Sequence, residues 1–240
     1  MADYDARIVD LYDGDNPDGP DHDYYRALAA ERGARRILDL GCGTGILTVT
    51  FSAPGRTVVG VDPSHAMLEY ARRRPGADTV RWVHGDGRSI PGSSYDLMVM
   101  TGNVAQHIPD PDWEQTLQAL RQVASPGAVL SFESRNPSAR AWESWVQDEP
   151  TTRETAHGTL TEWTEVDELG GGRVVLHSFN RFEATGDLVE EEVLLTFRAD
   201  EVLTQQLAAA GFDVRAIWGD WQRTPFDGTQ RLMVFEAQPV

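Results

Sequence analysis

The sequence predicts an α/β protein with a doubly wound, mostly parallel seven-stranded sheet and an inserted antiparallel β lid. Three observations lead to this fold class. From residue 35 to about 133, short β-branched runs alternate with helical stretches, as in a parallel sheet covered by helices. From 137 to 198 the chain changes to period-two alternation between glycine-containing turns, which is typical of an antiparallel meander. After 199, one more helix and two more strands complete the α/β unit.

The expected elements follow in chain order. A helix begins near Asp21, after a loop over residues 13–21, "DGDNPDGPD". The strands of the main sheet are expected at 35–40, 57–61, 79–83, 96–100, 127–133, 213–218 and 230–237, and the helices at 45–53, 64–74, 112–124 and 199–210. Three lid strands are expected at 159–166, 173–182 and 188–197. These elements divide the chain into an N-terminal cap segment (1–30), a core (31–136 and 199–240) and a lid (137–198).

The charge balance restricts the classes of ligand. Asp and Glu total 38 against 21 basic residues, and the formal net charge is −17. This surface repels phosphate backbones and anionic membranes, so we expect neither as a partner. All of the basic residues are arginine, so no lysine is available for a Schiff base or a P-loop.

The cellular location is expected to be cytoplasmic. No apolar run approaches the roughly 20 residues that span a bilayer, and the polar N-terminus is not a signal peptide. The one cysteine, Cys42, forms no internal disulfide, which fits a reducing compartment. No activating group accompanies Cys42 in the sequence, so a nucleophilic role is disfavoured. The oligomeric state is left open between a monomer and a homodimer.

A glycine-rich turn follows the first predicted strand. The stretch 37–45 reads "ILDLGCGTG", with glycines at 41, 43 and 45 and an acid at Asp39. The P-loop pattern fails for lack of lysine, and the dinucleotide pattern G-x-G-x-x-G fails because position 46 is Ile46. The stretch resembles motif I of class I S-adenosylmethionine-dependent methyltransferases. Because that family has a Rossmann-like fold, the resemblance agrees with the predicted sheet.

The resemblance continues through three further segments. Asp62 ends the second strand in "VVGVDPS", "SHAML" begins the next helix, "HGDGRSIP" resembles motif II, and "YDLMVMTGN" opens on the fourth strand. A departure occurs at Ala128, where the family commonly has a second glycine.

The resemblance implies S-adenosylmethionine as the cofactor. Glycines 41 and 43 would let the backbone approach its methionine end, and the following helix would direct N–H groups at its carboxylate. Asp39 would hold the turn and attract the sulfonium, Asp62 would bind the ribose hydroxyls, and Asp86 would bind the adenine amine. The full set of expected cofactor-binding residues is Tyr12, Asp39, Gly41, Cys42, Gly43, Asp62, Pro63, Met67, Gly85, Asp86, Gly87, Thr101, Gly102, Asn103 and His107. Met67 and Asp86 have structural alternatives, as a core residue and a turn residue.

Methyl transfer to a nitrogen, oxygen or carbon needs alignment, and a base only where the acceptor must lose a proton. His107, just after the fourth-strand loop, is the candidate catalytic residue, with helix capping or packing as the alternative. No histidine, cysteine or acid cluster has metal-ligand spacing, so no metal is expected. The expected substrate-binding residues are Tyr24, Arg135, Trp142 and Trp145. Further candidates for the same pocket are Tyr12, Glu133, and Trp218 or Trp221. Tyr24 or Tyr25 is expected to close over the cofactor.

The lid indicates a small-molecule methyl acceptor, because the resemblance associates such lids with enzymes that act on small molecules. Two alternatives remain open. The first is a protein that binds S-adenosylmethionine or S-adenosylhomocysteine without transferring a methyl group. The second is an NAD(P)-dependent oxidoreductase, which Ile46 disfavours.

Overall fold

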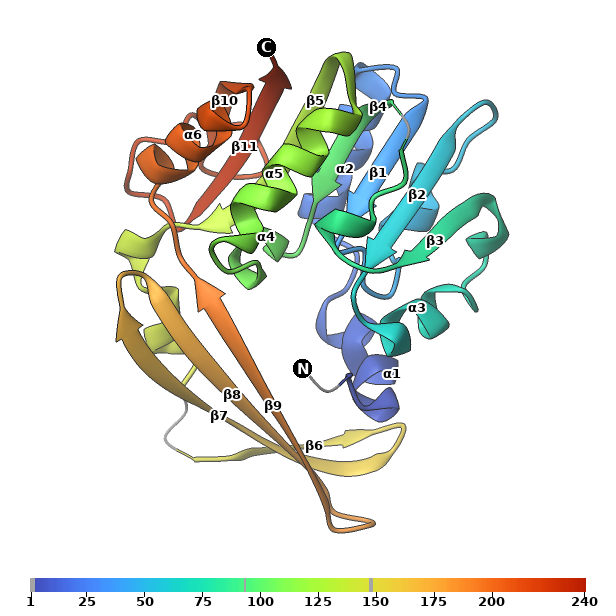
Figure 1. Cartoon of the computed structure of the whole chain (residues 1–240). Coiled ribbons are helices and arrows are strands. Elements are labelled where there is room, and N and C mark those ends of the chain that lie inside the picture. The colour runs from blue at the N-terminus through green and yellow to red at the C-terminus, as the bar shows by residue number, and fades with distance from the viewer. Residues whose placement is uncertain (1–2, 93, 147–148) are drawn as a thin grey trace.

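The computed structural model describes residues 3–92, 94–146 and 149–240 (Figure 1). It contains a seven-stranded sheet with the strand order β10-β11-β5-β4-β1-β2-β3 and a separate four-stranded sheet with the order β6-β7-β8-β9. The predicted fold class is therefore confirmed. The strands of the large sheet are β1 (Arg36–Leu40), β2 (Thr57–Asp62), β3 (Val80–His84), β4 (Tyr95–Met100), β5 (Ala124–Arg135), β10 (Phe212–Trp218) and β11 (Leu232–Pro239).

Strands β1 to β5 pair in parallel, and β11 is antiparallel to both β5 and β10, so β10 runs in the same direction as the first five. The chain moves outward from β1 to β3 and then returns to β4, on the other side of β1. The carboxyl ends of β1 and β4 therefore form the topological switch point, where ligands bind in open α/β sheets.

Helices cover both faces of this sheet (Figure 1). The helices of the chain are α1 (Ala6–Asp15), α2 (Pro20–Glu31), α3 (His65–Ala71), α4 (Val104–His107), α5 (Asp112–Val123) and α6 (Asp200–Ala209), of which α1 lies beyond the carboxyl edge of the sheet, next to the lid. One core lies under α5 and α6, where Leu117 and Leu120 are fully buried as their helical spacing predicts, and Val123 packs beside them. The other core lies under α2 and is centred on Tyr25, Leu28 and residues of β1 and β4.

The prediction of a helix at 45–53 is wrong. Only a short 3₁₀ helix, Thr48–Phe51, forms there. Gly45 takes a left-handed conformation (φ +73°), which ends regular helix geometry at that point. The Thr48 hydroxyl is bonded to Asp39 and does not cap a helix. The expected helix N-terminus directed at a carboxylate is therefore missing from this turn.

Helices α1 and α4 and strand β6 were not predicted. Helix α1 forms over residues that include part of the expected loop, which is shortened to 16–19, because Asp5 caps it by accepting from Arg7 N. Strand β6 (Thr151–Thr155) adds a fourth strand to the lid, beside β7 (Gly158–Gly170), β8 (Arg173–Phe182) and β9 (Asp187–Thr196).

The lid lies across from the carboxyl edge of the large sheet (Figure 1). Its return to the core is anchored by Arg198, a buried side chain that donates to the Ala105 and Ile108 carbonyls at 2.9 and 2.7 Å and pairs with Asp110. On the other side, α1 bridges to the lid through ion pairs of Arg7 with Asp187 and of Asp15 with Arg153, both at 2.8 Å. Sheet and lid are thus tied together at both ends of the edge between them.

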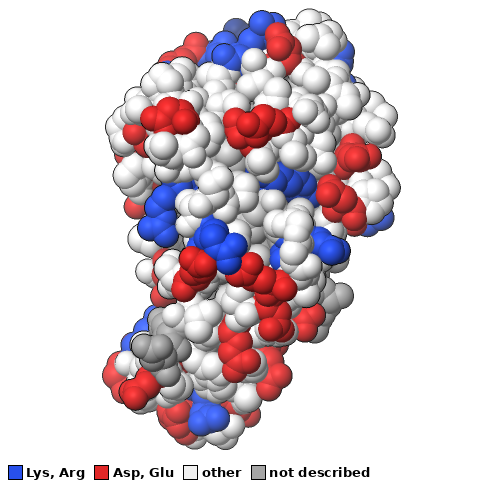
Figure 2. All heavy atoms as spheres, turned by 90° about the vertical axis from the view of Figure 1, so that its left-hand side faces the viewer, with Lys and Arg blue, Asp and Glu red and all other residues white. Residues whose placement is uncertain are grey.

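Acidic groups are distributed over core and lid, with the arginines of the face in Figure 2 lying mainly near the junction of the two parts. They alternate with acids there and do not merge into a broad basic surface. Within the residues that the structure describes, no helix combines the length and the apolar character needed to cross a bilayer.

Candidate functional site

The three glycines of the first turn have different environments. All have positive φ, at 77°, 53° and 73° for Gly41, Gly43 and Gly45. A Cβ on Gly41 would lie 2.7 Å from Val104 Cγ1, and one on Gly45 would lie 2.5 Å from the Trp82 ring. A Cβ on Gly43 would have no atom within 4 Å. The outer glycines therefore permit close packing, while the middle one faces open space at the switch point.

Asp39 is almost completely enclosed below this turn, at 1 % exposure. Thr48 Oγ1 donates to its Oδ2 at 2.7 Å, and its Oδ1 has no partner among the described residues. Burial raises the pKa of Asp39 to about 7 against the opposing bond from Thr48, and the nearby carboxylates of Asp62 and Glu133 contribute to this rise. The bond from Thr48 is a contact through which Asp39 can hold the turn, as expected. The Oδ1 atom of Asp39 remains available as a hydrogen-bond acceptor.

Asp62 ends β2 beside the glycine turn. Its Oδ2 accepts from Gly43 N and its Oδ1 from Ser64 N, each at 2.8 Å. Burial raises its pKa, while the two amide bonds oppose that rise. Tyr12 lies close enough that Asp62 adds to burial in raising the pKa of its phenol. Because a carboxylate oxygen has two lone pairs, both oxygens can still accept a ribose hydroxyl.

The predicted adenine segment is more exposed. Asp86 accepts from Arg88 N at 2.9 Å and forms an ion pair with the Arg88 guanidinium, which lowers the pKa of the carboxyl despite partial burial. Gly87 is packed against Thr116, so a Cβ there would lie 2.6 Å from Thr116 Oγ1. Gly85 has φ +152°. The Asp86 carboxylate is thus bonded locally, as its alternative role as a turn residue requires.

Three other expected cofactor residues have clear positions. Met67 is 4 % exposed in α3, in keeping with its alternative role in the core, and its amide is capped by Ser64 Oγ. Pro63 is exposed. Cys42 is buried, and burial raises the pKa of its thiol well above the ordinary value, which leaves it inert as a nucleophile.

The loop after β4 lies beside the glycine turn. Thr101 is half-buried, Gly102 is exposed with φ 72°, and Asn103 follows with φ 61°. A Cβ on Gly102 would meet no atom within 4 Å, so this loop also borders open space. The Oδ1 of Asn103 is buried and has no partner among the described residues.

His107 ends the short helix α4. Part of its ring remains exposed, yet the surrounding protein and the positive charge of Arg135 together lower its pKa to about 4. At neutral pH this imidazole is uncharged. It can therefore accept a hydrogen bond, although its low basicity suits it poorly to holding a proton.

Arg135 ends β5 on the same edge of the sheet. It is half-buried, and its guanidinium lies 5.2 Å from the centre of the Trp145 ring. Burial lowers its pKa, with Glu133 opposing this shift. Across residues 3–92, 94–146 and 149–240, no carboxylate forms an ion pair with it, and its guanidinium donates no hydrogen bond.

The other expected pocket residues lie in packed clusters. Tyr24 and Trp142 are each 4 % exposed, so they offer a ligand almost no surface. Tyr24 donates to Glu236 on β11, and Trp142 packs against Phe197 in the lid cluster with a ring separation of 4.5 Å. Trp221 packs against Tyr24 and Tyr25. Trp218 donates to Glu236.

The N-terminal segment holds residues that the sequence did not single out. Asp13 of α1 accepts from Thr44 Oγ1 at 2.6 Å and pairs with Arg74, which itself donates to the Thr44 carbonyl. Asp3 accepts from Ser64 Oγ at 2.6 Å and from Ala66 N at 2.9 Å. These acids brace the glycine turn and the start of α3. No local pattern marks them, since their partners lie 31 to 63 positions away.

The part of the chain that the structure describes contains no group of three or more histidine, cysteine or acidic side chains suited to holding a metal ion.

Comparison with known proteins places this arrangement in a family. Residues 37–127 match a family model described as a methyltransferase domain. The glycine N-methyltransferase of Mus musculus is 32 % identical over 152 residues, which cover 55 % of this chain and 51 % of that protein. The chain thus spans about half the length of the glycine N-methyltransferases that it matches.

A longer match covers most of both chains. The demethylmenaquinone methyltransferase of Thermus thermophilus is 30 % identical over 196 residues, 78 % of this chain and 79 % of that protein. Among solved structures, the CcbJ methyltransferase from Streptomyces caelestis has a TM-score of 0.78 at 21 % identity, covering 99 % of this chain and 100 % of that one. The S-adenosylmethionine-bound CalS10 from Micromonospora echinaspora has a TM-score of 0.70 at 20 % identity, with full coverage of both chains. The motif order, the sheet topology and these matches together show that the chain belongs to the class I S-adenosylmethionine-dependent methyltransferases.

Proposed function

We propose that this protein transfers a methyl group from S-adenosylmethionine to the nitrogen of a small acceptor that carries a carboxylate. The observation that carries the choice of acceptor is Arg135, a half-buried guanidinium without an ionic partner among the described residues. Removing a cation from water is costly unless an anion or hydrogen-bond acceptors replace the water. A ligand carboxylate that accepts both guanidinium N–H groups would supply that replacement.

The residues at the switch point fit the cofactor. Gly43 and Gly102 leave open space on two neighbouring loops, which side chains there would fill. Asp62 has spare lone pairs at the end of β2 for vicinal hydroxyls. Asp39 and Asn103 each keep a buried oxygen without a partner, and such acceptors match N–H donors and positive charge. The charged side chains in this set, Asp39 and Asp62, are both acids, which suits a cationic sulfonium better than a pyrophosphate.

When bound, S-adenosylmethionine supplies a methyl group on a positively charged sulfur, which departs as a neutral thioether. The acceptor amine must be unprotonated and aligned with that methyl group. Orienting the two reactants can contribute about 7–11 kcal/mol to lowering the barrier. Arg135 would hold the acceptor carboxylate, and the uncharged His107 would accept a hydrogen bond from the amine N–H and orient its lone pair. Because the pKa of His107 is about 4, the released proton would pass on to solvent.

The names of relatives include nitrogen acceptors, which supports a nitrogen acceptor for this chain. Glycine N-methyltransferases, the sugar N-methyltransferase KedS8 and the glycopeptide N-methyltransferase MtfA all occur among the matches. Oxygen acceptors are represented as well, by ubiquinone biosynthesis O-methyltransferases and by a malonyl-acyl-carrier-protein O-methyltransferase. Arg135 supports an acceptor that carries a carboxylate, and the glycine N-methyltransferases support an amine in the same molecule, as in glycine.

Calorimetry with S-adenosylmethionine and S-adenosylhomocysteine tests the cofactor. If the protein binds neither compound, the proposal is wrong. A thermal shift with NAD(P) alone would favour the oxidoreductase alternative. Binding without methyl transfer to any acceptor in a broad panel would favour the non-methylating binder.

The acceptor is tested with glycine and methylamine, which differ by the carboxylate. We expect methylation of glycine to exceed that of methylamine, and Arg135→Met to remove this preference while leaving the affinity for S-adenosylhomocysteine unchanged. Equal rates with the two amines in the unaltered protein would contradict the assignment of Arg135.

A further inference from the structure

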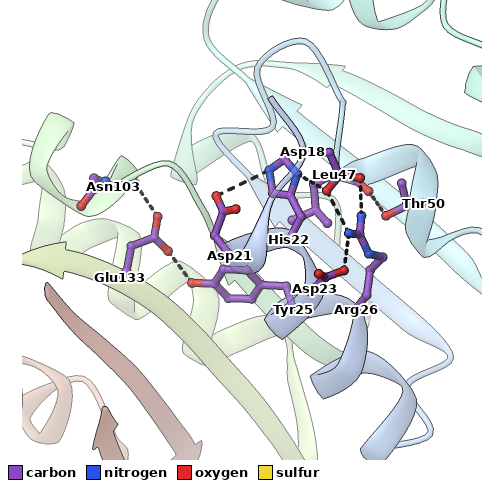
Figure 3. Close-up of polar contacts among 10 residues, drawn as sticks. All are labelled: Asp18, Asp21, His22, Asp23, Tyr25, Arg26, Leu47, Thr50, Asn103 and Glu133. Atoms are coloured by element: carbon purple, nitrogen blue, oxygen red, sulfur yellow. Dashed lines mark hydrogen bonds and ion pairs between the residues drawn. The ribbon is translucent and has the colours of Figure 1, made fainter. Parts of the chain in front are cut away.

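Strand β5 carries a carboxylate in a position where an apolar side chain is expected. Glu133 is 2 % exposed, and burial raises its pKa to about 7. Both of its oxygens are used (Figure 3): Tyr25 Oη donates to Oε2, and Asn103 N donates to Oε1 at 2.6 Å. Burying a carboxylate is costly even with such bonds. Its presence therefore requires an explanation in terms of what it holds.

What it holds is the turn after β4. Gly102 and Asn103 both have positive φ. A residue other than glycine adopts this backbone conformation only at a cost in free energy, and Asn103 is such a residue. Asn103 precedes α4 but makes no side-chain capping bond, so local capping does not hold the turn. The Glu133 carboxylate binds the Asn103 amide from the neighbouring strand and fixes it there.

The other end of the same segment is also held by β5. The fully buried Gln106 accepts from Arg135 N at 2.7 Å through its Oε1. Glu133 and Arg135 are two residues apart on β5, so they hold both ends of the segment 103–106 against the strand. The His107 ring extends from the end of this segment.

The position of the turn matters to the glycine loop because the two are packed together. Val104 fills the space where a Cβ on Gly41 would lie. A shift of the turn would therefore move Val104 against Gly41, or leave a void beside it. Either change alters the open space bordered by Gly43 and Gly102.

We infer that Glu133 is a positioning residue, which with Tyr25 holds the Gly102–Asn103 turn in the conformation that completes the cofactor and acceptor site. The expected effect of Glu133 on cofactor affinity rests on the proposed function. Its effect on the conformation of the turn does not depend on that function. Glu133 acts through the Asn103 amide and does not itself line the pocket, contrary to its expected place among the pocket residues. The function of the bond is geometric, so a neutral side chain of the same shape should replace it.

The chain offers a matched control one strand away. Glu236 of β11 is also buried, at 6 % exposure, and accepts from Tyr24 Oη at 2.9 Å, Trp218 Nε1 at 3.0 Å and Arg32 at 3.2 Å. Tyr24 and Tyr25 are neighbours on α2, so both carboxylates tie the same helix to the same sheet. Only Glu133 binds the turn after β4.

The test compares Glu133→Leu, Glu133→Gln and Glu236→Leu by amide hydrogen exchange over residues 101–107 and by calorimetry with S-adenosylhomocysteine. In Glu133→Leu we expect exchange at this segment to rise by about tenfold or more, and the affinity to fall by a similar factor. Glu133→Gln should stay within about threefold of the unaltered protein, because its Oε1 can accept from Asn103 N while its Nε2 donates to Tyr25 Oη. Glu236→Leu should leave both the amide exchange over residues 101–107 and the affinity for S-adenosylhomocysteine unchanged, even if it lowers the overall stability.

Tyr25→Phe and Tyr24→Phe repeat the comparison with the loss of one hydroxyl each, which keeps the test usable if a leucine variant fails to fold. We expect faster exchange at 101–107 in Tyr25→Phe only. Unchanged exchange in both Glu133→Leu and Tyr25→Phe, or equal effects of the Glu133 and Glu236 variants, would overturn the inference. A failure of the unaltered protein to bind S-adenosylhomocysteine would refute the proposed function instead, and the exchange result would still decide the role of Glu133.

Discussion

Replacing Gly41 and Gly43 separately by alanine should separate packing from ligand binding within one turn. Gly41→Ala places a methyl group 2.7 Å from Val104 Cγ1, closer than side-chain carbons approach. Gly43→Ala places the same methyl group in open space. Both positions have positive φ, at 77° and 53°, so both substitutions carry the backbone cost of a left-handed alanine.

The expected losses of stability follow from these two terms. A left-handed conformation costs a residue with a Cβ about 1–2 kcal/mol. Overpacking adds about 1–3 kcal/mol at Gly41 and nothing at Gly43. The free energy of unfolding should therefore fall by about 2–5 kcal/mol in Gly41→Ala and by about 1–2 kcal/mol in Gly43→Ala. For the affinity for S-adenosylhomocysteine we expect the opposite order, with the larger loss in Gly43→Ala, because the methyl group added at position 43 occupies the space assigned to the cofactor.

Urea unfolding and calorimetry with S-adenosylhomocysteine measure the two effects. Val104→Ala removes the two crowding carbons and leaves only Cβ, at 3.1 Å, so it should recover part of the stability lost in Gly41→Ala. Additive losses in that double-mutant cycle would refute the packing argument. Unchanged affinity in Gly43→Ala would show that the cofactor does not lie over this glycine.

Three further predictions use the same measurements. Asp62→Ala should weaken S-adenosylhomocysteine binding by about 1–3 kcal/mol, because the ribose hydroxyls lose their acceptor; unchanged affinity would show that the ribose assignment is wrong. Asp13→Asn should weaken the same binding without abolishing folding, because position 13 loses its ion pair with Arg74 while its bond to Thr44 in the glycine turn persists; Asp10→Asn, on the same helix, is the control. Glu133→Gln should flatten the pH dependence of stability, measured by urea unfolding.

The sign of that last effect follows from the raised pKa of Glu133, about 7 in the folded protein against an ordinary value of 4.5. The folded state keeps the proton over this range, so the stability contributed by the protonated form is complete below the lower value and is lost as pH rises through about 7. Between about pH 5.5 and about pH 8, this loss amounts to about 2 kcal/mol. Asp39 titrates in the same range, and the Glu133 charge helps to raise its pKa, so the difference between the two proteins reports Glu133 together with its coupling to Asp39. Identical slopes would contradict the burial argument.

The fold class was predictable because its signals are local. The β-branched runs alternating with helices indicate a parallel sheet, and each run formed a strand within a few residues of its expected bounds. The failures occurred where a contact distant in sequence determined the conformation. The stretch 45–53 has helical composition, yet Gly45 is held in a left-handed conformation beneath Trp82, and Thr48 is bonded to Asp39.

The same distinction applies to the site. The sequence by itself indicated a methyltransferase cofactor, because the glycines and acids that follow successive strands form a pattern in one dimension, and it excluded the P-loop outright for lack of lysine. It could not distinguish Tyr24 from Tyr25 or Glu133 from Glu236, which belong to the same helix and to neighbouring strands. Only the tertiary structure placed Glu133 between the Tyr25 hydroxyl and the Asn103 amide. It also left Arg135 half-buried without an ionic partner among the described residues. These bonds join a helix residue and a loop residue to β5 over 108 and 30 positions, and no local pattern of side chains encodes which of them will meet.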